Sequence, residues 1–138
     1  MSVTESSDWS GDALLSAIVK RNPVATFVLN AGGEVTHWNR ACELLTGVQA
    51  HQVLGTRQAW AAFYTTERPV LADLVLKAGH EQHEALDLAP LFYTRFHTSN
   101  SVEHGIEAED FFPHMGTQGR WLYFTAAPLY NADGHLCG

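Results

Sequence analysis

The chain has 138 residues, a formal net charge of −7 and a hydrophobic fraction of 46%, which is typical of one folded globular domain and not of a disordered chain. Its acidic balance and its lack of a basic cluster argue against binding of the nucleic-acid backbone. No apolar run approaches the roughly 20 residues of a membrane span, and the polar start lacks the features of a secretory signal, so we expect a cytoplasmic chain without direct membrane contact, even where a parent protein is anchored elsewhere.

We predict that residues 1–11 form a disordered lead and that residues 12–138 form a single domain. The first helix is expected over 12–21, because apolar residues recur there at helical spacing, at Leu14, Leu15 and Ile18. The dipeptide Asn22-Pro23 ends this helix, because a residue that precedes proline avoids the α conformation.

Two strands are predicted over 25–29 and 35–38, joined by a Gly-Gly turn. A helix should follow over 40–46, because Asn39 is a favourable N-cap and Gly47 is a favourable C-terminal stop. This order of strand, turn, strand and capped helix is the most informative stretch of the chain.

The second half of the chain is predicted to begin with a helix over 67–78, whose apolar residues form one stripe. Residues 80–104 show no regular pattern, and an irregular stretch of about 25 residues usually is a binding loop or is partly disordered. Three further strands are expected near 105–112, 120–130 and from 135 onward. Strands that are grouped apart from helices indicate an α+β domain with an antiparallel sheet.

Several segments in this order resemble one family of small sensory domains: NPVATFVLNAGGEVTHWNRACELLTG at 22–47, Gly55-Thr56, RPVLADL at 68–74, EAEDFFP at 107–113 and RWLYFTAAPL at 120–129. The family is the PAS domain, and the likeness covers roughly residues 12–138. Among PAS domains the segments are most similar to cytoplasmic sensor modules of bacterial histidine kinases and GGDEF-type diguanylate cyclases.

The resemblance implies a five-stranded antiparallel sheet in the order 2-1-5-4-3, with short helices packed over one face and an N-terminal cap helix. In such a sheet the fifth strand is central, yet the chain is truncated at Gly138, after only three or four residues of that strand. We therefore expect an excised fragment whose neighbouring strands have unpaired backbone groups. Such a fragment is either marginally stable or shielded at the gap by a dimer partner.

The resemblance also implies a ligand pocket between the sheet and the helices. Mapping onto the fold places eight residues around this pocket: Phe27, Leu45, Trp60, Leu71, Leu74, Phe112, Leu122 and Phe124. The expected function is therefore that of a sensory or regulatory input domain that binds a small ligand, dimerises, or does both, and passes a signal to the output domain of a parent protein. No motif of a hydrolase, a P-loop enzyme or a zinc protease is present, so we expect no enzymatic activity in the domain itself, while the parent would carry a kinase or cyclase domain.

Two alternatives to a metabolite sensor stay open. His80 and His83 lie three residues apart near the end of the helix over 67–78, where some PAS domains ligate haem, so a haem-based gas or redox sensor is one alternative. Non-covalent flavin is compatible with the sequence as well, and no other metal site is expected. The second alternative is a ligand-free dimerisation module. Alternation places Trp121 and Tyr123 on one face of their strand and Leu122 and Phe124 on the other, so one apolar face is available for a homodimer partner.

Overall fold

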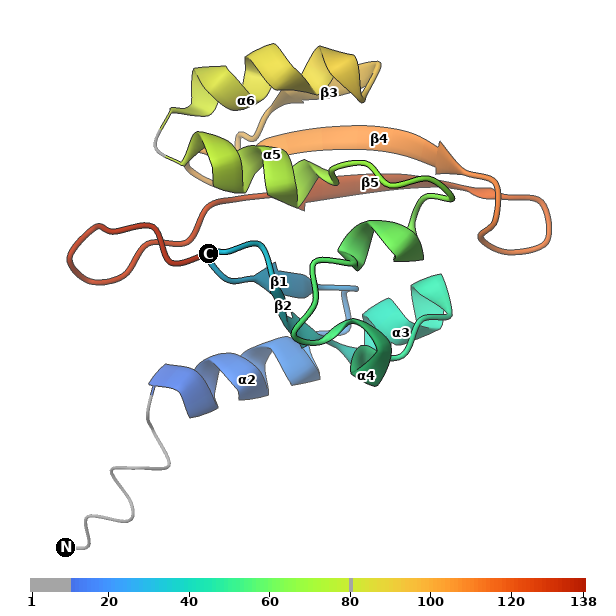
Figure 1. Ribbon diagram of the computed structural model, residues 1–138, viewed down its shortest axis with the longest axis horizontal. Helices are drawn as coiled ribbons and strands as arrows, with labels where there is room; N and C mark the ends of the chain where they lie inside the picture. Colours follow the sequence, from blue (N-terminus) through green and yellow to red (C-terminus); the bar gives the residue numbers. More distant parts are fainter. Residues whose placement is uncertain (1–10, 80) are drawn as a thin grey trace, which may run out of the picture.

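The computed structural model describes residues 11–79 and 81–138 (Figure 1). Short helices dominate the first two thirds of the chain and strands the last third. The elements in order are α2 (Gly11–Arg21), β1 (Phe27–Leu29), β2 (Val35–Trp38), α3 (Arg40–Thr46), α4 (Ala50–Val53), the 3₁₀ helix η1 (Ala59–Ala62), α5 (Leu71–Ala78), α6 (Gln82–Leu88), the 3₁₀ helix η2 (Ala89–Leu91), β3 (Arg95–Thr98), β4 (Ile106–Phe112) and β5 (Arg120–Ala126).

The strands form two antiparallel sheets, which confirms the predicted α+β class. The first sheet contains β1 and β2, and the second has the order β3-β4-β5. In Figure 1 the two-stranded sheet (blue) lies below the three-stranded sheet (orange and red), and the C-terminal end of the chain lies between them. α2 and α4 pack against β2, while α5 packs against β4 and β5.

The structure corrects the prediction for residues 80–104. This stretch is not irregular, because it contains α6, η2 and the unpredicted strand β3. β3 pairs with β4 in a continuous register from Arg95 opposite Glu109 to Thr98 opposite Ile106. The strand has no strong apolar pattern of its own, so its partner strand, and not its sequence, determines its conformation.

Among the described residues the strands form two separate sheets, so the expected order of five strands in one sheet is not confirmed. In the segment from 135 onward, the structure has one isolated bridge, between Tyr130 and Leu136. Gly138 nevertheless lies between the two sheets: its carbonyl accepts a hydrogen bond from Leu129 N at 2.8 Å, and a Cβ on Gly138 would lie only 2.5 Å from the Leu29 carbonyl oxygen. Gly138 thus touches both sides of the space between β1 and β5. Because strands in a sheet lie about 4.8 Å apart, a space that one residue fills in this way has the width of a single strand.

The helix over 40–46 is confirmed at both ends. Asn39 caps it by accepting a hydrogen bond from Cys42 N at 2.9 Å, and Gly47 ends it in the left-handed conformation with φ of 75°. α5 is shorter than predicted because it begins at Leu71. The Asp73 carboxylate accepts a hydrogen bond from Val70 N at 2.9 Å at this start, so Val70 and not an earlier residue is the N-cap.

Asn39 also connects elements that are distant in sequence. Its side chain is 3% exposed, and its amide nitrogen donates to three carbonyls, those of Val19, Asn22 and Val24, at 3.1, 3.2 and 2.9 Å. Its amide oxygen accepts from Thr26 N at 3.0 Å in addition to the capping bond. One side chain thus joins the end of α2, the start of β1 and the start of α3.

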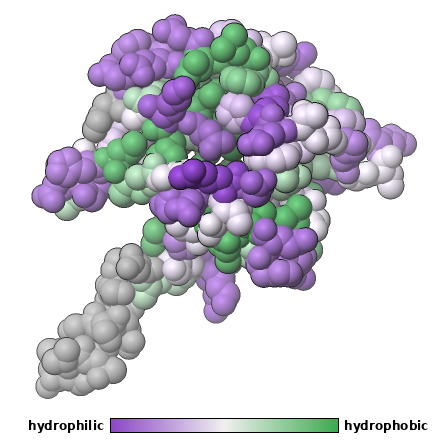
Figure 2. Space-filling model, in the orientation of Figure 1, coloured by the Kyte–Doolittle hydropathy of each residue, from purple (hydrophilic) through white to green (hydrophobic). Residues whose placement is uncertain are grey.

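The surface of the domain is mainly hydrophilic on the face shown in Figure 2, with hydrophobic residues in smaller patches between hydrophilic ones. The core has two parts, one between α5, α6 and the three-stranded sheet, and one around β1, β2 and α3. Among the residues that the structure describes, no helix combines the length and hydropathy that a membrane span requires.

We expect Asn39→Ala to lower the free energy of unfolding by about 3 kcal/mol, because it removes a helix cap together with the hydrogen bonds of a buried amide to three backbone carbonyls and to Thr26 N. Urea unfolding followed by tryptophan fluorescence measures this change. Asn100→Ala is the matched control, because Asn100 is exposed, and a change within about 0.5 kcal/mol is expected there. Equal stabilities of the two variants would contradict the role assigned to Asn39.

We further expect a strand fused after Gly138 to raise the melting temperature. A segment of about eight residues that alternates valine with threonine or glutamate can pair with β5 and β1. The expected rise is about 5 °C or more over a glycine-serine segment of equal length. If the two fusions melt at the same temperature, the gap between β1 and β5 does not accept a strand.

Candidate functional site

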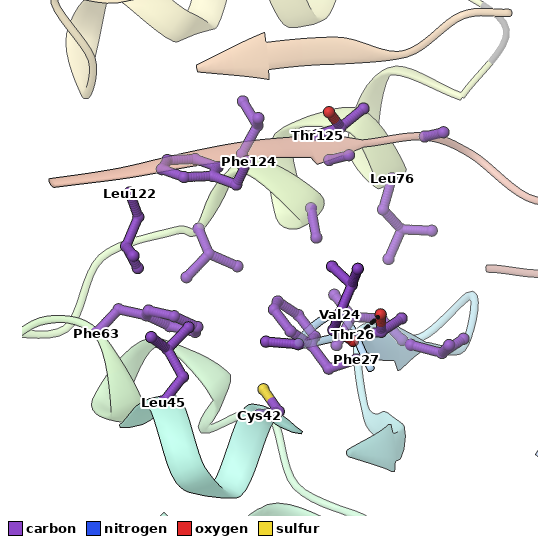
Figure 3. Close-up of a pocket in the computed structure, with 18 of the residues that line it drawn as sticks. Val24, Thr26, Phe27, Cys42, Leu45, Phe63, Leu76, Leu122, Phe124 and Thr125 are labelled. Carbon is purple, nitrogen blue, oxygen red and sulfur yellow. Dashed lines mark hydrogen bonds between the residues drawn. The ribbon is translucent and has the colours of Figure 1, made fainter. Parts of the chain in front are cut away.

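A cavity of about 590 Å³ lies between the two sheets and under α5. Figure 3 shows side chains that face the cavity from β5 on one side, with Leu122 and Phe124, and from β1 and α3 on the other, with Phe27, Cys42 and Leu45. Its volume is within the range of roughly 300–1,000 Å³ that is usual for small-molecule sites.

The structure brings most of the predicted pocket residues together at this cavity. Six of the eight line it: Phe27, Leu45, Leu71, Phe112, Leu122 and Phe124. The other two, Leu74 and Trp60, are not among its lining residues. Leu74 packs in the core with Ile106 and Ala108, and Trp60 is half-buried on η1 with its indole nitrogen lacking a hydrogen-bond partner.

The cavity has two parts with different walls. Consecutive residues of the β1 segment, 24–29, and of the β5 segment, 122–129, line one part together with Gly138. Side chains alternate between the two faces of a strand, so a surface that touches every consecutive residue cannot be one face. The edges of the two strands therefore form this wall. The other part lies under the helices and is walled by side chains of α3, α5 and the segment that follows η1.

Four phenylalanine rings form a connected group on the wall of the cavity. Phe63 contacts Phe112 edge-on at a centroid distance of 5.8 Å and Phe27 at 6.0 Å, and Phe112 lies 6.2 Å from Phe124. These rings come from four different parts of the chain and present an almost continuous apolar surface. Such a surface favours an apolar ligand body.

Cys42 adds a neutral thiol to the apolar wall. It is buried on α3 and lines the cavity. Burial, with a smaller contribution from the nearby Glu43 carboxylate, raises the pKa of the Cys42 thiol to about 12. The thiol is therefore protonated at physiological pH and is a poor nucleophile, so it acts here as a small apolar group.

One end of the cavity carries a polar cluster that the sequence interpretation missed. Tyr64 and Tyr93 line the cavity, and the Tyr64 hydroxyl lies 3.4 Å from the Tyr93 hydroxyl and 3.0 Å from Asp110 Oδ2. The Arg68 guanidinium stacks on the Tyr64 ring at 3.8 Å and lies 4.9 Å from the centroid of Tyr93. The only local signal was an arginine, Arg68, at the start of the largely apolar stretch RPVLADL.

Of the two histidines considered as haem ligands, the structure describes His83 alone. His83 is exposed on α6, is not among the cavity-lining residues, and its Nδ1 lies 3.4 Å from Glu81 Oε2. His80 lies outside the described residues. Within residues 11–79 and 81–138, no group of three or more histidine, cysteine or acidic side chains is arranged to hold a metal ion.

The outer face of the three-stranded sheet is aromatic, as the alternation along β5 predicts. Trp121 and Tyr123 are 58% and 57% exposed, whereas Leu122 and Phe124 are half-buried. Leu122 and Phe124 line the cavity, and Tyr123 borders it as well. Phe111 of β4 packs beside Trp121 at a centroid distance of 5.5 Å. This confirms the predicted division of β5 into an inner and an outer apolar face.

Comparison with known proteins gives one family. The family model described as "PAS fold" matches residues 13–138. No curated protein matches the chain, and no solved structure does.

Proposed function

The chain belongs to the PAS family, and from that membership we propose that it is the sensory or regulatory input domain of a bacterial signal-transduction protein. PAS domains are in general sensory and signalling modules. In this proposal the domain works in the cytoplasm, forms a homodimer, and controls a histidine kinase or diguanylate cyclase output domain. It performs no catalysis of its own and responds to a small ligand.

The cavity is the observation that carries the proposal. It encloses about 590 Å³ between sheet and helices, and the lining is dominated by aliphatic and aromatic side chains with few polar groups. A close-packed core would leave no void of this size. A ligand that fills the helix-side part would recover contacts with Phe63, Leu45 and Phe124, which now face an open volume.

Hydrogen bonds of the Asn39 side chain connect residues that line the cavity to the terminal helix α2. Val24, Thr26 and Cys42 line the cavity, and each is hydrogen-bonded through its backbone to the Asn39 side chain. The same side chain binds the Val19 carbonyl near the end of α2. A ligand that binds one arrangement of these walls more tightly than another would shift the position of α2.

We expect native mass spectrometry of the purified protein to show a non-covalent small molecule that Ala72→Trp removes by more than about tenfold in occupancy, because Ala72 lines the cavity on α5. Ala61→Trp is the matched control, since Ala61 is exposed on η1 and should keep full occupancy. Circular dichroism checks that both variants fold.

A UV–visible spectrum of the same sample identifies the class of ligand. A Soret band that is lost on His83→Ala would favour the haem alternative, and a flavin band would identify non-covalent flavin. If the purified protein has no adduct and a thermal-shift screen of apolar metabolites finds none, after haem and flavin reconstitution, the ligand-sensing proposal is wrong.

The outer sheet face favours dimerisation as a second function. Trp121, Tyr123 and Phe111 form an exposed aromatic surface on β4 and β5, and the exposed Leu14, Leu15 and Ile18 lie on α2. An exposed aromatic cluster like the one on β4 and β5 marks a protein interaction site. A homodimer that buries them would connect two copies of the domain without any ligand.

We expect Trp121→Glu to weaken self-association by about tenfold or more, because it places a charge at the centre of the aromatic surface. Sedimentation equilibrium measures the change. Leu91→Glu is the control, because Leu91 is 72% exposed at a different place, on η2. A wild-type protein that stays monomeric at high concentration, or equal effects of both variants, would exclude this surface as the dimer interface.

A further inference from the structure

The wall of the cavity carries no charged side chain. Within the described residues, 11–79 and 81–138, its lining consists of aliphatic, aromatic and small residues with a few hydroxyls and one thiol, and it includes no aspartate, glutamate, lysine, arginine or histidine. The Cys42 thiol is protonated, because burial raises its pKa to about 12. A charged group of a ligand would therefore lose its water in the cavity without meeting an opposite charge, which is unfavourable.

Both tyrosine hydroxyls at the end of the cavity are engaged within the polar cluster. Tyr64 donates its one proton to Asp110 Oδ2 at 3.0 Å, and the Tyr64 oxygen, 3.4 Å from the Tyr93 hydroxyl, is the acceptor left for the proton of Tyr93. Arg68, which does not line the cavity, donates to the Tyr93 oxygen. Burial raises the pKa of both tyrosines, so both stay neutral. The cluster therefore offers a ligand neither a free proton nor a net charge.

The other hydroxyls of the lining are engaged or lie on the outer face of the sheet. Thr26 Oγ1 donates to the Val24 carbonyl at 2.8 Å, and the Tyr123 hydroxyl donates to the Glu107 carboxylate. Thr125 is directly opposite Glu107 in the register of β4 and β5, so the two side chains share the outer face. These side chains leave the polar groups of a ligand without partners, so the lining favours a ligand with little polar surface.

Phenylalanine rings face the cavity from two opposite walls. Phe124 comes from β5, whereas Phe27 and Phe63 come from the opposite side (Figure 3). Phe112 connects the two walls, because its ring centroid lies 5.8 Å from that of Phe63 and 6.2 Å from that of Phe124. A flat aromatic ring between these walls would make edge-on and offset contacts with several rings, and a saturated molecule of equal size would not.

We propose that the ligand of this cavity is an electrically neutral aromatic molecule. The proposal rests on the ligand-sensing function proposed above and names the class of its ligand. The uncharged wall and the engaged hydroxyls select against carboxylates, phosphates and ammonium groups, and the phenylalanine rings select for aromatic over saturated molecules. A cavity of about 590 Å³ is large enough for a molecule of two fused rings.

The first test compares 2-acetylnaphthalene with 2-naphthoate at neutral pH. The two molecules share their rings and a carbonyl group, and they differ in a methyl group against a charged oxygen. We expect 2-acetylnaphthalene to bind the wild-type protein at least about 100-fold more tightly in calorimetry, because the carboxylate would be buried unpaired. Ala72→Trp should abolish this binding, whereas Ala61→Trp, at an exposed position outside the lining, should not change it.

The second test compares acetophenone with cyclohexyl methyl ketone, which differ in the saturation of one ring. We expect Phe124→Leu to lower the ratio of the acetophenone affinity to the cyclohexyl methyl ketone affinity by about threefold, because it removes a ring contact and keeps an apolar wall. Phe96→Leu is the matched control, since Phe96 packs against the core outside the lining and should leave the ratio unchanged. Phe63→Leu replaces Phe124→Leu if that variant does not fold.

The outcomes separate this proposal from the ligand-sensing function. Equal or tighter binding of 2-naphthoate, or an affinity ratio that Phe124→Leu and Phe96→Leu change equally, overturns the neutral aromatic class and leaves an apolar ligand site in place. The class is also wrong if neither naphthalene probe binds, although native mass spectrometry shows an adduct that Ala72→Trp removes. If neither probe binds and the purified protein also lacks any adduct, the ligand-sensing function fails and this proposal fails with it.

Discussion

The arrangement of this domain depends on the hydrogen bonds of one buried amide, that of Asn39. Its side chain fixes the start of α3, the start of β1 and the end of α2 at a single point. An amide has both donors and an acceptor, so it can satisfy carbonyl and N–H groups that converge from three segments. A carboxylate there would lack donors for the Val19 and Val24 carbonyls, and an alanine would lack both functions.

The two sheets form the second constraint, because the space between them determines what the domain can hold. β1 and β5 are not paired with each other, and Gly138 begins to occupy the width of one strand between them. Backbone edges therefore bound one end of the cavity, whereas side chains of α3, α5 and the segment that follows η1 bound the other. The first end has the shape for an extended backbone, and the second has the shape for a compact apolar molecule. A strand in the gap and a ligand on the helix side are therefore compatible.

The parts of the fold that the sequence predicted well are those with local causes. α3 was predicted with both ends because Asn39 and Gly47 act through neighbouring residues. β3 was not predicted, since RFHT becomes a strand only beside β4. At the site, mapping onto the family found six residues of the apolar wall, whereas the polar cluster was missed. Tyr64 and Asp110 are 46 residues apart, and no spacing rule connects them.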